Sequence, residues 1–216
     1  MRNHDGIEAA LSLERFSRYM EWAGGDRERA VDLYTLNSRI SESLYIAMQM
    51  LEVALRNSIH SVMSEKYSPD WMIGTDVLKT DMQIERVSEA TQGLQEARKE
   101  ITPDKVVAAL SFGFWTTMLN NDYETLWQQG LYKIVLLENG RGTTRKKLST
   151  PLTPIRILRN RVAHHEPILH WNLNKHYSSM CKITKWLSSP ASEWCREHSR
   201  FPSVCPRERV DLIRDE

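Results

Sequence analysis

The sequence is poor in the features that mark exported, membrane-spanning or disulfide-bonded proteins. It has only three cysteines in 216 residues and no C-x-x-C pair, which argues against a disulfide framework and a structural zinc site. Its longest apolar run, from Val106 to Leu110, is far shorter than the roughly 20 residues of a membrane-spanning helix. The N-terminal residues include no apolar segment of the signal-peptide kind. We therefore expect a cytoplasmic protein with reduced thiols and no membrane contact.

Signals for β-strands are also lacking. Glycine and proline number only 9 and 8, and no stretch alternates apolar and polar residues as a half-buried strand does. We find no internal repeat and no low-complexity tract. With 41% hydrophobic residues, the chain can form one compact domain with a substantial core. We expect a single all-α domain over residues 1–216.

Helical patterns cover most of the chain. Asp26 can cap a long run that ends near Tyr67, with a possible break near Asn37 or Ser41. Apolar residues recur along this run at spacings of three and four, as in a helix with one buried face. They are Leu44, Met48, Leu51, Leu55, Ile59 and Val62. This segment is expected to be the long central helix of a bundle.

Shorter helices are expected on both sides of the central one. Gly24-Gly25 should end the first, and Pro103 suits the first position of another. The stretch Glu138–Thr150 reads as a loop. In chain order, the helices are expected at 12–23, about 79–100, from 103, on both sides of a turn near 120–121, from Pro151 or Pro154 to Pro167, near 172–188 and near 205–215. The aromatic residues at helical spacing are expected in the core, namely Phe112, Phe114, Trp115, Tyr123 and Trp127.

The charge is unevenly distributed along the chain. Residues 1–140 carry 14 Lys and Arg against 21 Asp and Glu, or 14 − 21 = −7, whereas residues 141–216 carry 15 against 7, or +8. Such asymmetry fits an anionic partner such as nucleic acid. It also fits two parts of one domain that attract each other.

The densest cluster of titratable side chains is RNRVAHHEP, residues 159–167. On a helix, Asn160 and His164 share a face, with Arg156 one turn earlier. Arg159 lies about 140° away from His164, because five residues separate them at about 100° each. One regular helix therefore does not direct both side chains at a single atom unless its end distorts or a second copy contributes.

Arginine and histidine together suit attack on a phosphodiester. A neutral imidazole can take the proton of an RNA 2′-hydroxyl, and a protonated one can give a proton to the leaving 5′-oxygen. Arginine can hold the phosphate bidentately as charge develops. In this interpretation His164 is the general base or acid, Arg159 stabilises the phosphate, and Asn160 orients the His164 ring or the phosphate. No metal and no cofactor is required.

Two other interpretations of the cluster stay open. Histidine near a helix C-terminus is favoured by the helix dipole, so capping alone can account for part of the string. A metal site would use His164, His165, Glu166 and His170. Their spacing matches no known closed zinc pattern.

The string LRNRVAHHEPI, residues 158–168, closely resembles the signature of the Abi-like proteins, which are bacterial abortive-infection proteins of the HEPN superfamily. Its R-x4-6-H motif falls on Arg159, Asn160 and His164. Residues 45–60, followed by the tryptophan of SPDWM, resemble the N-terminal part of that family, and residues 109–119 resemble its middle. Together these segments span roughly residues 26–175.

The resemblance implies an HEPN-like helical bundle with additional C-terminal helices. It also implies a homodimer that brings two motifs together at the subunit interface, and metal-independent endoribonuclease activity in phage defence or as a toxin. An antitoxin or a regulatory RNA is then a possible partner. The superfamily also includes non-catalytic members, so the alternative is a module that binds RNA or a protein. One branch carries a tyrosine two residues after the histidine, where this chain has Glu166.

Several basic residues outside the motif are candidate RNA contacts. Arg56 and His60 share one helix face and echo the motif at a shorter spacing, although polar positions on a core helix are the reading we favour. The segment Gly140–Lys147 could follow an RNA backbone or be a solvated loop. The full set of tentative RNA contacts is Arg56, His60, Arg145, Lys146, Lys147, Arg156, Arg161 and His165.

Overall fold

The computed structural model describes residues 11, 13–74, 76–135 and 143–213, which contain helices and no β-strand. The expected all-α class is confirmed. In chain order the elements are α2 (Leu13–Trp22), α3 (Arg27–Lys66), α4 (Asp81–Glu96), α5 (Pro103–Ala109), α6 (Phe112–Thr117), η1 (Asn121–Tyr123), α7 (Glu124–Gln128), η2 (Leu131–Ile134), α8 (Arg145–Ala163), α9 (Leu173–Leu187), α10 (Ser189–His198) and α11 (Phe201–Val204).

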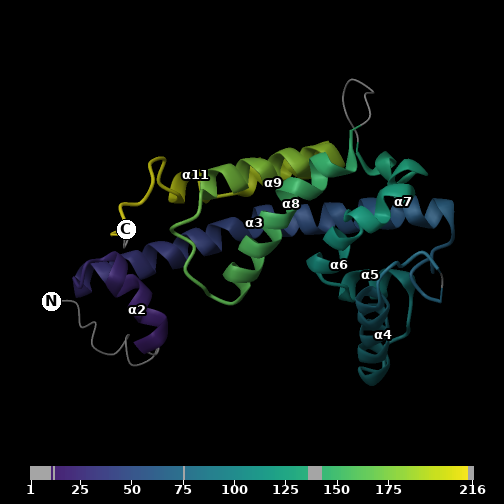
Figure 1. The fold of residues 1–216 in the computed structure, drawn as a ribbon, viewed down its shortest axis with the longest axis horizontal. Helices are drawn as coiled ribbons and strands as arrows, with labels where there is room; N and C mark the ends of the chain where they lie inside the picture. The colour runs from purple at the N-terminus through teal and green to yellow at the C-terminus, as the bar shows by residue number, and fades with distance from the viewer. Residues whose placement is uncertain (1–10, 12, 75, 136–142, 214–216) are drawn as a thin grey trace.

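Helix α3 is the axis of the molecule (Figure 1). Its 40 residues rise about 60 Å in total at 1.5 Å each. Asp26 caps it as expected, because its carboxylate accepts the Arg29 amide at 3.1 Å. The break considered near Asn37 or Ser41 is wrong. Hydroxyls in this stretch bond back to the preceding turn, as Thr35 does to Val31 O at 2.8 Å and Ser38 to Tyr34 O at 3.0 Å, so they remain within the helix.

The apolar stripe predicted for α3 is buried. Leu44, Leu51, Leu55 and Ile59 are fully enclosed, and Met48 is nearly so. Only Val62 is half-buried, because the neighbouring Met63 faces the core instead. Within the described residues, no helix, α3 included, is both long and apolar enough to cross a membrane.

The other helices are distributed along both halves of α3 (Figure 1). Helix α2 packs on its N-terminal part, and α5, α6 and η2 also contact α3. Helices α9, α10 and α11 pack along α3 from the C-terminal part of the chain, and α8 lies against α6 and α9. The five aromatic residues expected in the core are buried there.

Helix α8 begins earlier than the sequence indicated. We expected its start at Pro151 or Pro154, but it starts at Arg145 and includes both prolines. Each proline removes one backbone donor from the helix. Tertiary burial offsets this loss, since Leu148 and Leu152 continue the buried stripe of the later turns. The basic residues 145–147 are therefore helical, and residues 138–142 of the expected loop lie outside the described residues.

The C-terminal region also differs from the expectation. Helix α9 lies where it was predicted, but α10 was missed. The helix expected near 205–215 is absent from the described part, residues 205–213. This segment runs back to α2 instead, where the Ile213 amide donates to Trp22 O at 3.1 Å and Leu212 is buried. The segment thus connects the C-terminal region to α2.

Candidate functional site

The string RNRVAHHEP forms the end of α8 and a complete C-terminal cap. The His165 amide donates to Val162 O at 3.1 Å, and the Glu166 amide donates to Arg161 O at 2.8 Å. These two bonds define a Schellman motif, in which the residue after the cap adopts a left-handed conformation. That residue is His165, with φ of 57°. The backbone of His165 and Glu166 thus closes the C-terminal end of α8.

Glycine normally occupies this left-handed position, because a side chain there costs about 1–2 kcal/mol. Pro167 follows the cap and prevents the helix from continuing. The string thus forms an ordinary helix end, but it has a histidine at the left-handed position where glycine is favoured. Such local strain persists only where the surrounding structure holds it.

The surroundings hold this helix end through Asn37 of α3. The buried Asn37 side chain accepts the Ile168 amide at 2.8 Å and donates to Glu166 O at 3.5 Å. Arg161 adds bonds to Pro167 O at 3.2 and 3.3 Å and an ion pair with Glu166 at 3.3 Å. The turn after the motif is therefore fixed to α3.

Arg159 lies half-exposed at the edge of a hollow of about 370 Å³ between α3 and α8. Its Nη2 lies 3.5 Å from Oε2 of Glu52, and the side chain of Glu52 is 20% exposed. Arg56 lines the same hollow from α3, one turn after Glu52. The structure thus brings Arg159 together with Arg56, and with an acidic residue that the sequence reasoning did not single out.

His164 is exposed at the end of α8 and is not among the described residues that line this hollow. Helix α8 extends through Ala163, so ideal helix geometry places His164 about 140° from Arg159. Asn160 is exposed, and Arg156 is half-buried with its stem over Gly113 of α6. Within one chain, the arginine and the histidine of the motif face different directions.

His165 faces a second hollow, of about 850 Å³, on the other side of Tyr45 and Val162. The N-terminal half of α3 lines it with several hydroxyl side chains, and Arg200 and Glu42, which form an ion pair, also line it. The motif helix therefore ends between two hollows, one with Arg159 and one with His165.

His60 proves to be a supporting residue of the core. Its Nδ1 accepts the indole N–H of the buried Trp71 at 3.1 Å. Burial lowers the pKa of His60, partly offset by nearby Asp104, so the ring is neutral at neutral pH. It also lines a third hollow, of about 620 Å³, which it shares with Arg56. This arrangement agrees with the structural reading of His60 that we favoured.

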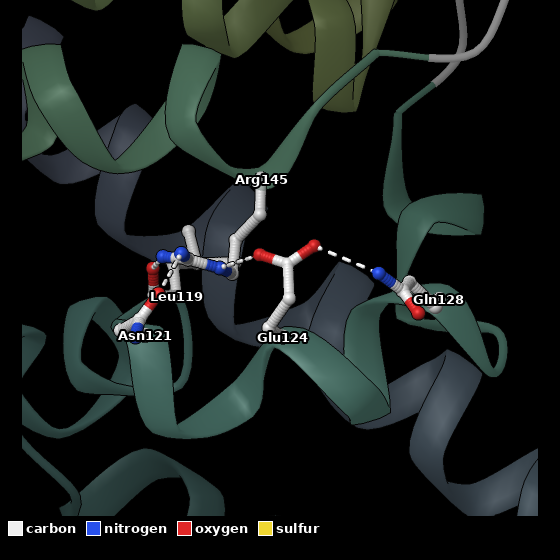
Figure 2. A network of polar contacts seen from close by, with 5 residues as sticks. All are labelled: Leu119, Asn121, Glu124, Gln128 and Arg145. Carbon is white, nitrogen blue, oxygen red and sulfur yellow. Dashed lines mark hydrogen bonds and ion pairs between the residues drawn. The ribbon is translucent and has the colours of Figure 1, made fainter.

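Arg145, a tentative RNA contact, is buried at the opposite end of α8 (Figure 2). Its guanidinium donates to Glu124 at 2.7 Å, to Asn121 at 3.0 Å and to the carbonyl oxygen of Leu119. We remove it from the RNA-binding set, because a group with these partners is not available to a ligand. Arg161 is half-buried and also donates to Pro167 O, and it stays a tentative RNA contact.

Lys146 and Lys147 are exposed, but they stand in the first turn of α8. The helix rises about 1.5 Å per residue, so they lie roughly 20 Å along the axis from Arg159 and farther still from His164. Any contact that they make with RNA is with a distant part of the strand.

Two residues that position the motif, Asn37 and Glu52, were not recognised as such in the sequence. Asn37 had been noted only as a possible helix break. The one available signal was the position of this asparagine among apolar residues at helical spacing. A side chain buried at such a position needs hydrogen-bond partners. Glu52 offered no signal, because its partner is more than 100 residues away. Within the described residues, no three His, Cys, Asp or Glu side chains are grouped so that they could hold a metal ion.

Comparison with known proteins adds one match. A family model described as Abi-like protein matches residues 11–172, which is more than half of the chain. Neither a curated protein nor a solved structure matches the chain significantly. The matched region includes α3 and α8, and it ends just before α9.

Proposed function

The chain belongs to the Abi-like protein family, and from that premise we propose that it is a metal-independent endoribonuclease of the HEPN type. It would act on cytoplasmic RNA in bacterial abortive infection or as a toxin. The observation that carries the proposal is the end of α8. There Arg159 opens onto a hollow that holds a second arginine, and the exposed His164 follows five residues later on the capped helix end.

In the proposed reaction, the RNA 2′-hydroxyl attacks the adjacent phosphorus. One imidazole takes the proton from the 2′-hydroxyl, and a protonated imidazole gives a proton to the departing 5′-oxygen. Arg159 stabilises the charge that develops on the phosphate oxygens. Asn160, one turn from His164, supports the ring or the phosphate. The products are a 2′,3′-cyclic phosphate and a 5′-hydroxyl.

The angle between Arg159 and His164 supports a site shared by two chains. If two α8 ends face each other across a two-fold axis, one cleft holds two copies of each residue. Exposed apolar side chains near the motif favour such a contact, with Tyr45 64% and Ile157 44% exposed. We therefore propose an isologous homodimer with the site at the interface.

The test is incubation of the purified protein with mixed RNAs, with and without EDTA. We expect cleavage in EDTA, cyclic phosphate or 3′-phosphate ends, and survival of substrates with 2′-deoxy at the scissile position. Products with 3′-hydroxyl ends, or activity abolished by the chelator, would contradict this mechanism.

The shared site is tested by mixing subunits. Wild-type chains re-equilibrated with a threefold excess of His164→Ala chains leave about one dimer in sixteen fully wild-type by random pairing. Activity per wild-type chain should fall well below its unmixed value. A constant value would mean that each chain carries its own complete site.

A second candidate is a non-catalytic HEPN module that binds RNA or a protein partner, such as an antitoxin. The ion pair between Arg159 and Glu52 favours it, because a paired arginine is less available to a reacting phosphate. RNA binding by the wild-type protein without cleavage under any of the conditions above would support this candidate.

A further inference from the structure

Arg56 forms no ion pair with any of the described residues. Its Nε is buried and has no hydrogen-bond partner among the described residues. A buried polar group in this state costs free energy, and native structures rarely leave one without a partner. Glu52, one turn earlier on α3, would be the natural partner, but it pairs with Arg159.

The hollow of about 370 Å³ gathers both arginines around one acid. Of the described residues that line it, Arg56 and Arg159 are cationic and Glu52 is anionic, which leaves a net charge of 2 − 1 = +1. Gln49 and the exposed Tyr45 add neutral polar groups at its rim. Guanidinium groups recognise phosphate through paired N–H donors, so two of them around one hollow suit an anion with several oxygens.

We infer that this hollow binds one phosphodiester of the RNA between Arg56 and Arg159, and that the phosphate displaces Glu52 from Arg159. The inference rests on the proposed function and extends it, because Arg56 becomes a substrate-binding residue outside the R-x4-H motif. Glu52 becomes the residue that positions the Arg159 guanidinium in the empty site.

The Glu52–Arg159 pair is suited to exchange. Its N–O separation of 3.5 Å is long, and the side chain of Arg159 is 36% exposed, so little is lost when the pair opens. A phosphate that enters gains two guanidinium partners and meets one repelling carboxylate. Removing the charge of Glu52 should therefore strengthen RNA binding, and removing Arg56 should weaken it. If these residues had a purely structural role, the two substitutions would not change RNA affinity in opposite directions.

The experiment measures binding of a short RNA with 2′-deoxy at every scissile position, by fluorescence anisotropy at several salt concentrations. Arg56→Ala should weaken binding about 10-fold or more and lower the salt slope by about 0.7. The affinity of the Arg56→Lys protein for RNA should lie between those of the wild type and Arg56→Ala. Lysine keeps the positive charge but lacks the paired N–H donors of a guanidinium. Glu52→Gln should strengthen binding. Inorganic phosphate should compete with the RNA in the wild type and less in Arg56→Ala.

Arg39→Ala is the matched control, since Arg39 is an exposed arginine of the same helix that does not line this hollow. Thermal melts should show every variant folded. Equal binding by the Arg56→Ala and Arg39→Ala proteins, or weaker binding by Glu52→Gln, overturns the inference. Failure of the proposed function looks different, because the wild type would then bind this RNA as described but leave the all-ribose RNA uncut.

Discussion

The two ends of α8 each carry an arginine, and the structure uses them in opposite ways. Arg145 at the first residue is buried and donates to three different residues (Figure 2). Arg159, four turns later, is half-exposed and has one ion pair at 3.5 Å. The first holds α8 against η1 and α7, whereas the second faces a hollow. Residue type and neighbouring charges in the sequence do not distinguish the two arginines. The number of hydrogen-bond partners that each guanidinium has in the structure does.

The largest effect is expected at Arg159. Arg159→Ala should lower the rate of RNA cleavage by about 100-fold or more, because a donor to the developing charge is lost. The free energy of unfolding of the Arg159→Ala protein should differ from that of the wild type by no more than about 1 kcal/mol, as for other half-exposed ion pairs. Initial cleavage rates and thermal melts measure both quantities, with Arg39→Ala as the control. If the Arg159→Ala protein melts at as low a temperature as the Arg145→Ala protein, both arginines stabilise the fold and the proposed difference between the two ends of α8 is wrong.

Arg145→Ala should show the reverse pattern. The free energy of unfolding should fall by about 3 kcal/mol, since Glu124 and the Leu119 carbonyl lose a buried cationic donor. For a chain of this size the melting temperature should drop by roughly 6–12 °C. Lys146→Ala, an exposed neighbour, is the control and should stay within about 0.5 kcal/mol of the wild type. A stable Arg145→Ala protein with poor RNA binding would return Arg145 to the RNA contacts.

Asn37→Ala tests what fixes the functional end. The buried Ile168 amide would lose its acceptor, which should cost about 1–3 kcal/mol of stability. Cleavage should also fall, because the turn after His164 is no longer tied to α3. Ser38→Ala, the next residue on α3, is the matched control, since its hydroxyl bonds only within the helix. Unchanged stability in urea unfolding would mean that Arg161 alone secures the turn.

The smallest effect is expected at His165. His165→Gly should raise the free energy of unfolding by about 1 kcal/mol, because glycine adopts the left-handed conformation without strain. His165→Ala should give no such gain. Urea unfolding separates the two variants. If the glycine variant is not more stable, contacts of the imidazole in its hollow offset the backbone strain.

The parts of the fold that follow local rules could be predicted. Asp26 marks the start of α3, and its apolar spacing identifies the buried face. The start of α8 could not be predicted, because Pro151 is a local signal against a helix and the burial of Leu148 is a tertiary one. The R-x4-H spacing is visible in the sequence. The contact of Glu52 with Arg159 could not be predicted, because it depends on how two distant helices pack.

The tie between Asn37 and the turn after α8 joins residues 131 positions apart, which has a consequence for synthesis on the ribosome. At about 5–20 residues per second, α3 emerges on the order of ten seconds before the turn that it must hold. Helices α9 to α11, which cover α3, come later still. A chain released early therefore exposes the apolar face of α3 and has no assembled motif. Premature termination should yield fragments that aggregate or are degraded, and not fragments that cut RNA.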